Sequence, residues 1–132
     1  MLGIDVGEKR IGIAVNQGRV AVPLTIITHT NRDDDIARIT QIARDEQVSA
    51  IVVGLPLMMS GDEQEQARAS RRFGERLAEA TALPVVYSDE RLSSADVRAA
   101  RQRHGDKRRE HIDDLAAAVI LQRYIDTQEP TG

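Results

Sequence analysis

The chain has 132 residues, 41% of them hydrophobic, and a net charge of −3, which suits a single globular domain. The absence of cysteine excludes disulfides and thiolate metal sites, and no apolar run approaches the roughly 18 residues that a membrane span needs. The N-terminus lacks a basic-then-apolar leader, so we expect a cytoplasmic protein that contacts no membrane.

The first part of the chain predicts three antiparallel strands. The runs 2–6 and 11–15 are β-type and are separated by a turn at 7–10, which indicates a hairpin. A third run, 20–28, contains Pro23. Because proline cannot donate to the hydrogen-bond ladder, this run is expected to be an edge strand or to contain a bulge.

The rest of the chain predicts alternating helices and strands. Apolar residues recur there at helical spacing or form short continuous runs, which are typical of buried parallel strands. In chain order these segments are a helix over 31–46, a strand over 49–56, a helix from about 60 to 80, a strand over 84–90, a short helix over 95–103 and a helix over 112–125. Gly54 and Pro56 are expected to end the first of these strands. The second helix is expected to begin at a capping box formed by Ser60 and Glu63, to end at about Ala80 and to have Phe73 and Leu77 on its inner face. This order predicts one mixed sheet with helices packed on it, in a single domain over 1–126 with a flexible tail over 127–132.

Three regions place an acid where a purely structural protein would prefer an apolar or neutral residue. Asp5 lies in the first apolar strand, where a charge is costly unless backbone N–H groups or a cation stabilise it. Asp89 and Glu90 follow a buried strand, and Asp113 begins a helical stripe that would face the sheet. Each acid also has a structural alternative. Asp89 and Glu90 could form an ion pair with Arg91 at the end of the strand, and Asp113 could be stabilised by the helix dipole at the N-terminus of its helix.

Taken together, these acids predict a divalent-metal site. Acids that repel each other need cations between them, and a chain without cysteine offers oxygen and imidazole ligands that favour hard ions such as Mg²⁺ or Mn²⁺. Two such metals about 4 Å apart would activate a water and stabilise the leaving oxygen in phosphodiester hydrolysis.

Basic residues near the acids are candidates for phosphate contacts. Lys9 and Arg10 follow the first strand, and the segment 98–109 contains six Lys or Arg residues. The alternative for this segment is a solvated helix face and loop, and Arg10 is equally suited to an exposed strand position. The full set of predicted nucleic-acid contacts is Lys9, Arg10, Arg91, Arg98, Arg101, Lys107, Arg108 and Arg109.

Four segments of the chain resemble the YqgF/RuvX family of Holliday-junction-resolvase-like proteins, which have an RNase H-like fold. They are DVGEKRIGIAV from Asp5, VVGLPLMMSG from Val52, SDERLSSADV from Ser88 and IDDLAAAVILQRYID from Ile112, in the family's order. The resemblance implies an α/β fold with a mixed five-stranded sheet, in which three antiparallel strands are extended by parallel ones and flanked by helices.

The resemblance also implies that Asp5, Glu90 and Asp113 are the catalytic residues and metal ligands. Asp89 and Asp114 stand beside them as alternative ligands, and family members often have a small residue where this chain has Asp114. The family's Asn-x-x-Gly is replaced here by Met-Met-Ser-Gly, and serines stand where threonines are usual. The residues expected to shape loops around the site are Gly7, Gly54, Pro56, Gly61, Ser93 and Ser94.

The family implies a cytoplasmic nuclease that uses Mg²⁺ or Mn²⁺ and matures the 5′ end of pre-16S rRNA, with structured RNA or a ribosomal precursor as its partner. One alternative is a DNA endonuclease that resolves branched DNA as a dimer, and another is a non-catalytic nucleic-acid-binding module on the same fold. An actin-type ATPase or sugar kinase also has Asp-x-Gly in a hairpin, but it needs two lobes and 132 residues hold one. The sequence leaves monomer and homodimer both open.

Overall fold

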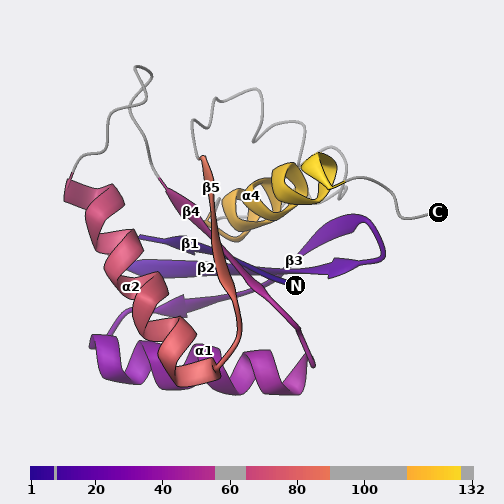
Figure 1. Cartoon of the computed structure of the whole chain (residues 1–132). Helices are drawn as coiled ribbons and strands as arrows, with labels where there is room; N and C mark the ends of the chain where they lie inside the picture. The colour runs from indigo at the N-terminus through magenta and orange to yellow at the C-terminus, as the bar shows by residue number, and fades with distance from the viewer. Residues whose placement is uncertain (8, 56–64, 90–112, 129–132) are drawn as a thin grey trace.

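The five strands form one mixed sheet in a computed structural model that describes residues 1–7, 9–55, 65–89 and 113–128. The strand order is β3-β2-β1-β4-β5 (Figure 1). Strand β2 is antiparallel to both β1 and β3, whereas β4 runs parallel to β1 and β5 runs parallel to β4, as the sequence predicts. The strands are β1 (Leu2–Val6), β2 (Arg10–Gln17), β3 (Val20–Thr28), β4 (Ile51–Leu55) and β5 (Val85–Asp89).

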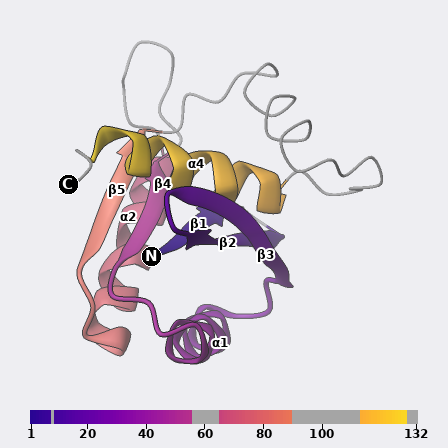
Figure 2. The same cartoon turned by 90° about the vertical axis from the view of Figure 1, so that its right-hand side faces the viewer.

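Helices cover both faces of this sheet. Helices α1 and α2 lie on one face and α4 lies on the other (Figures 1 and 2). Their bounds are α1 (Arg32–Asp45), α2 (Glu65–Thr81) and α4 (Asp113–Thr127). The predicted capping box at Ser60 and Glu63 and the predicted short helix over 95–103 lie outside the described residues. Among the helices described, none is long and apolar enough to cross a membrane.

Each face of the sheet has its own apolar core. On the α1 and α2 face, Ile4 packs with Phe73 and Leu77, which confirms the predicted inner face of α2. On the other face, Ala117 and Ile120 of α4 are fully buried against β2, β3 and β4. These two residues lie four and seven positions after Asp113, and they face the sheet as the spacing predicts.

The edge strand β3 contains a bulge. Ile13 pairs with Thr25 and Ala14 pairs with Pro23, so Leu24 is left without a partner in the ladder. The edge position and the bulge both accommodate the missing N–H of Pro23. This confirms the interpretation of the third apolar run.

Helix α4 lies directly against β1 at Gly3. A Cβ atom at Gly3 would be 2.7 Å from the Cβ of Leu121 and 3.0 Å from the carbonyl oxygen of Ala117. A residue without a side chain therefore lets the helix approach the backbone of β1, which is the strand that carries Asp5.

Candidate active site

Asp5 lies on the face of the sheet that α4 covers. Side chains alternate along a strand, and Leu2, Ile4 and Val6 pack in the core under α1 and α2. Gly3 meets α4, so Asp5, two residues further along, shares its face. Asp5 is partly exposed and interacts with other groups of the protein, so it is not an isolated buried charge.

Two glycines flank Asp5 on this face. Gly12 of β2 is its direct antiparallel partner. The parallel register of β1 and β4, continued by one residue, brings Gly54 to the other side of Asp5, and Gly54 pairs in turn with Ser88 of β5. Neither neighbouring strand therefore adds a side chain beside the carboxylate of Asp5.

The prediction that Gly54 ends its strand and shapes a loop is wrong. Gly54 lies inside β4, which continues to Leu55, because its backbone pairs with Ser88 of the neighbouring strand. Gly54 instead leaves the position next to Asp5 without a side chain. Gly12 was not predicted as a site residue, but it could have been found from the hairpin, since a turn centred between residues 8 and 9 pairs position 12 with Asp5.

The other predicted acids that the structure describes lie at element ends. Strands β1, β4 and β5 are parallel, so their carboxyl ends share one edge of the sheet. Asp89 is the last residue of β5 and pairs with Leu55. Asp113 and Asp114 are the first two residues of α4. For these three acids the structure gives the backbone position only.

Contacts at the opposite edge orient α4. The guanidinium of Arg19 donates to the carbonyl oxygen of Ile125 at 3.0 Å, and the backbone N–H of Ala21 donates to Oε1 of Gln122 at 2.8 Å. Both contacts lie at the turn between β2 and β3, which is at the amino-terminal end of β1. The helix therefore runs from Asp113 at the carboxyl edge toward this turn.

Three separate elements thus bring Asp5, Asp89 and Asp113 to the carboxyl edge of the sheet. Carboxylate oxygens are the ligands that Mg²⁺ and Mn²⁺ prefer, so the donor chemistry suits such an ion. In the described part of the chain no three His, Asp or Glu side chains form a ready metal site. The predicted ligand Glu90 lies outside the described residues.

The turn after β1 carries the exposed basic residues Lys9 and Arg10. The N–H of Gly7 donates to the carbonyl oxygen of Arg10 at 2.9 Å, and a Cβ at Gly7 would lie 2.5 Å from that same oxygen. The geometry of the turn itself therefore accounts for Gly7. Arg10 lies two residues before Gly12 in β2, so both are on the same face of the sheet. Because Gly12 pairs with Asp5, Arg10 is also on the face of Asp5.

Several predicted site residues lie outside the described residues. They include most of the predicted nucleic-acid contacts and most of the predicted loop residues. They are Pro56, Gly61, Glu90, Arg91, Ser93, Ser94, Arg98, Arg101, Lys107, Arg108 and Arg109.

A cluster of polar side chains around the buried Asp35, beside the turn after β1, was not predicted from the sequence. Asp35 is fully buried, and its carboxylate contacts Nδ1 of His29 and lies 3.6 Å from the guanidinium of Arg32. The backbone N–H of His29 donates to the carbonyl oxygen of Lys9 at 2.9 Å, which ties this cluster to the turn. The acids at the start of α1 predicted a helix start, but no local pattern shows that one of them is buried.

A model of the RuvX family, described as Holliday junction resolvase, matches residues 1–127. The chain belongs to the RuvX family. A RuvX relative from Anaeromyxobacter sp. (strain Fw109-5) is 43% identical over 130 residues and covers 95% of both chains. Another, from Synechocystis sp. (strain ATCC 27184 / PCC 6803 / Kazusa), is 42% identical over 130 residues, or 95% of this chain and 86% of the relative. Both relatives carry the provisional name of a pre-16S rRNA nuclease.

Solved structures of two resolvases share the fold of this RuvX chain. RuvC of Thermus thermophilus has a TM-score of 0.61 at 17% identity, covering 94% of this chain and 92% of RuvC. The Holliday junction resolvase of fowlpox virus has a TM-score of 0.61 at 13% identity, covering 96% of this chain and 98% of the resolvase. The likeness confirms the predicted RNase H-like fold, with its mixed five-stranded sheet flanked by helices.

Proposed function

We propose that this protein is a divalent-metal-dependent nuclease of the bacterial cytoplasm that processes the 5′ end of pre-16S rRNA. Within this family, the observation that carries the proposal is the placement of Asp5. Its carboxylate lies between Gly12 and Gly54 on the α4 face of the sheet. The carboxyl edge there is also reached by Asp89 and by the start of α4.

The proposed catalytic acids and metal ligands are Asp5, Glu90 and Asp113, with Asp89 and Asp114 as alternatives. When bound, Mg²⁺ or Mn²⁺ supplies a Lewis acid for the phosphate and lowers the pKa of a water that serves as nucleophile. The protein's own contribution is to position the substrate. Neither of the two glycines beside Asp5 places a side chain where the phosphodiester is proposed to bind.

Basic residues give the proposed nuclease its affinity for the RNA backbone. Lys9 and Arg10 lie in the turn that directly follows β1, and Arg10 is on the face of Asp5. The segment 98–109 and Arg91 are proposed to extend this contact along the strand. Because phosphate contacts carry little sequence information, we expect the shape of the precursor RNA or a ribosomal partner to determine where the protein cuts.

Branched DNA is the second candidate substrate, because the matching family model is described as a Holliday junction resolvase. A competition experiment separates the two. A labelled precursor of 16S rRNA and a labelled four-way DNA junction are offered together with Mg²⁺, with Mn²⁺ or with a chelator. We expect metal-dependent cutting of the RNA in preference to the junction. Preferential cutting of the junction would replace rRNA processing by DNA resolution, and cutting of neither would contradict a nuclease function.

A further inference from the structure

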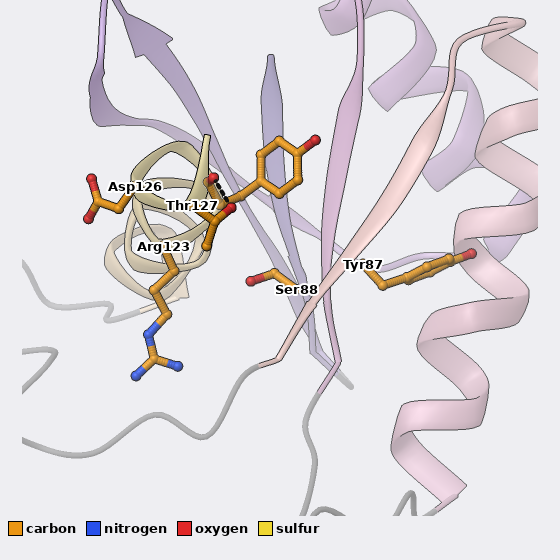
Figure 3. A pocket seen from close by; sticks show the side chains of 6 residues that line it. Tyr87, Ser88, Arg123, Asp126 and Thr127 are labelled. Carbon is orange, nitrogen blue, oxygen red and sulfur yellow. Dashed lines mark hydrogen bonds between the residues drawn. The ribbon is translucent and has the colours of Figure 1, made fainter. Parts of the chain in front are cut away.

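Asp35 is a fully buried acid that the proposed cleavage does not use. Some polar side chains near the sheet bond within their own helix. In the cavity of about 580 Å³ between β5 and α4, for example, the hydroxyl of Thr127 donates to the carbonyl oxygen of Tyr124 at 2.6 Å (Figure 3). Asp35, in the first turn of α1, instead contacts residues that precede its helix. A buried carboxylate is costly unless its oxygens accept hydrogen bonds, so these contacts show what Asp35 holds in place.

Both oxygens of Asp35 bind residues that follow β3. Oδ2 contacts Nδ1 of His29, and Oδ1 accepts from the backbone N–H of Thr30 at 3.3 Å. Because an ionised carboxylate only accepts hydrogen bonds, we assign the hydrogen in the contact with His29 to Nδ1. The guanidinium of Arg32 lies 3.6 Å from Oδ2 and partly balances the buried charge. Asp35 therefore joins the start of α1 to the segment at the end of β3.

The same segment is hydrogen-bonded to the turn after β1. The backbone N–H of His29 donates to the carbonyl oxygen of Lys9 at 2.9 Å. This bond lies one position beyond the pair of Arg10 with Thr28, which is the last pair between β2 and β3. Arg38 of α1 adds a second link, since its guanidinium donates to the carbonyl oxygen of Thr28 at 3.0 Å. Helix α1 thus holds the end of β3, and the end of β3 holds the turn.

Lys9 depends on this link for the position of its backbone. It is exposed and precedes the first residue of β2, so it lies outside the regular ladder. A lysine ammonium is carried on a flexible four-carbon stem, and the place it reaches therefore depends on where its backbone is fixed. The charge that the proposed RNA contact uses is thus placed by a bond from His29, whose ring is in turn held by Asp35.

We propose that Asp35 is a positioning residue, which fixes the turn after β1 through His29 and so holds Lys9 toward the RNA backbone. This inference rests on the proposed nuclease function. It gives a role in substrate binding to an acid of α1, which covers the face of the sheet opposite to Asp5. Asp35 touches neither the RNA nor the metal, so its effect falls on the affinity for RNA and not on the chemical step.

Asp35→Asn tests the proposal, because position and charge act in opposite directions. An amide has one acceptor oxygen where the carboxylate has two, so the bond to His29 or to Thr30 is lost. Loss of a negative charge by itself would strengthen RNA binding or leave it unchanged. We expect instead that the KM for a pre-16S rRNA fragment rises about two- to fivefold, as loss of one exposed ion pair does, while kcat stays at the wild-type value.

Asp34→Asn is the matched control, because it removes the same charge from the exposed neighbouring residue. Its KM should not rise. In a Lys9→Gln background, Asp35→Asn should raise KM no further, since its effect passes through Lys9. A KM for Asp35→Asn at or below that of Asp34→Asn would overturn the proposal, and so would an equal rise with and without Lys9.

A second pair of variants tests the link if Asp35→Asn does not fold. His29→Asn keeps an N–H donor near the place of Nδ1, whereas His29→Ala removes it, and both lack the ionisable ring. Without RNA, hydrogen exchange of the amide at position 29 should be about fivefold faster in His29→Ala than in His29→Asn, as loss of one hydrogen bond predicts.

The amide of Ala21, which donates to Gln122 at the other end of the sheet, should exchange equally in the two variants. Equal exchange at position 29, or the same acceleration at Ala21, would overturn the proposal. If wild type cleaves no RNA, the nuclease function fails, and the exchange result alone decides whether Asp35 positions the turn.

Discussion

Tyr87 shows how single residues connect the sheet to α2. Its ring lies 5.1 Å from the guanidinium carbon of Arg71, and a Cβ at Gly74 would come within 2.6 Å of its hydroxyl. Burial raises the pKa of Tyr87 above its ordinary value of 10.0, and the charge of Glu75 adds to this effect while that of Arg71 opposes it. The folded protein therefore favours the neutral phenol.

The raised pKa of Tyr87 has a measurable consequence. Its contribution to stability is complete below the unfolded value of 10.0 and is lost as the pH rises through the higher folded pKa. In Tyr124→Phe, where Tyr87 is the remaining tyrosine, an ultraviolet titration of phenolate should have a midpoint above 10.0. The same variant in denaturant serves as the reference. A folded midpoint at or below that of the denatured chain would show that α2 does not shield the phenol.

At the scale of elements, the position of α4 depends on Gly3. In Gly3→Ala the new methyl group meets the carbonyl oxygen of Ala117 at 3.0 Å and the Cβ of Leu121 at 2.7 Å. Because the carbonyl belongs to the helix backbone, relief requires α4 to move. We expect a loss of about 1–3 kcal/mol in urea unfolding, together with slower cleavage, since α4 begins with Asp113, a proposed metal ligand.

Gly18→Ala is the matched control for this prediction. Gly18 has a φ of +61°, and no atom lies within 4 Å of the place that a methyl group would take there. Alanine at this position therefore costs only about 1 kcal/mol of backbone strain. Cleavage by Gly18→Ala should stay at the wild-type rate. Equal loss of cleavage in both variants would mean that general destabilisation, and not the position of α4, explains the effect.

Local patterns predicted most elements, because each strand or helix has a periodicity or a breaker that acts within a few residues. Pro23 indicated an edge or bulge from its missing N–H alone. The prediction that Gly54 ends its strand was wrong because glycine usually weakens a strand. In the structure its backbone pairs with Ser88, which belongs to a strand more than thirty positions away in the chain. The burial of Asp35 was not predicted from its own helix, because His29, which contacts its carboxylate, lies outside α1 and just after β3. The position of Asp5 in the first strand was predictable, and the hairpin could have paired Gly12 with it, but the approach of Gly54 depends on the register of β1 and β4.

At the scale of the whole molecule, a net charge of −3 makes local basic groups decisive for binding RNA. Lys9 lies at the carboxyl edge of the sheet, in the turn after β1, whereas Arg44 lies in the last turn of α1. Lys9→Gln should weaken RNA binding and reduce the magnitude of the slope of log affinity against log salt by about 0.7, the value for one phosphate contact on a single strand. Arg44→Gln, which removes the same charge elsewhere, should leave that slope unchanged. Equal slopes for Lys9→Gln and wild type would remove Lys9 from the proposed interface.

The central claim is that Asp5 takes part in metal-dependent cleavage of RNA. The most direct measurement is the single-turnover cleavage rate of a pre-16S rRNA fragment by wild type, Asp5→Asn and Asp45→Asn, each with Mg²⁺, Mn²⁺ or chelator. Asp45 is an exposed acid at the end of α1 and serves as the control. We predict that Asp5→Asn unfolds at a temperature no lower than wild type yet loses more than about 100-fold in rate, beyond what loss of an outer-shell metal contact causes. Cleavage by Asp5→Asn at the rate of wild type and Asp45→Asn would contradict the account.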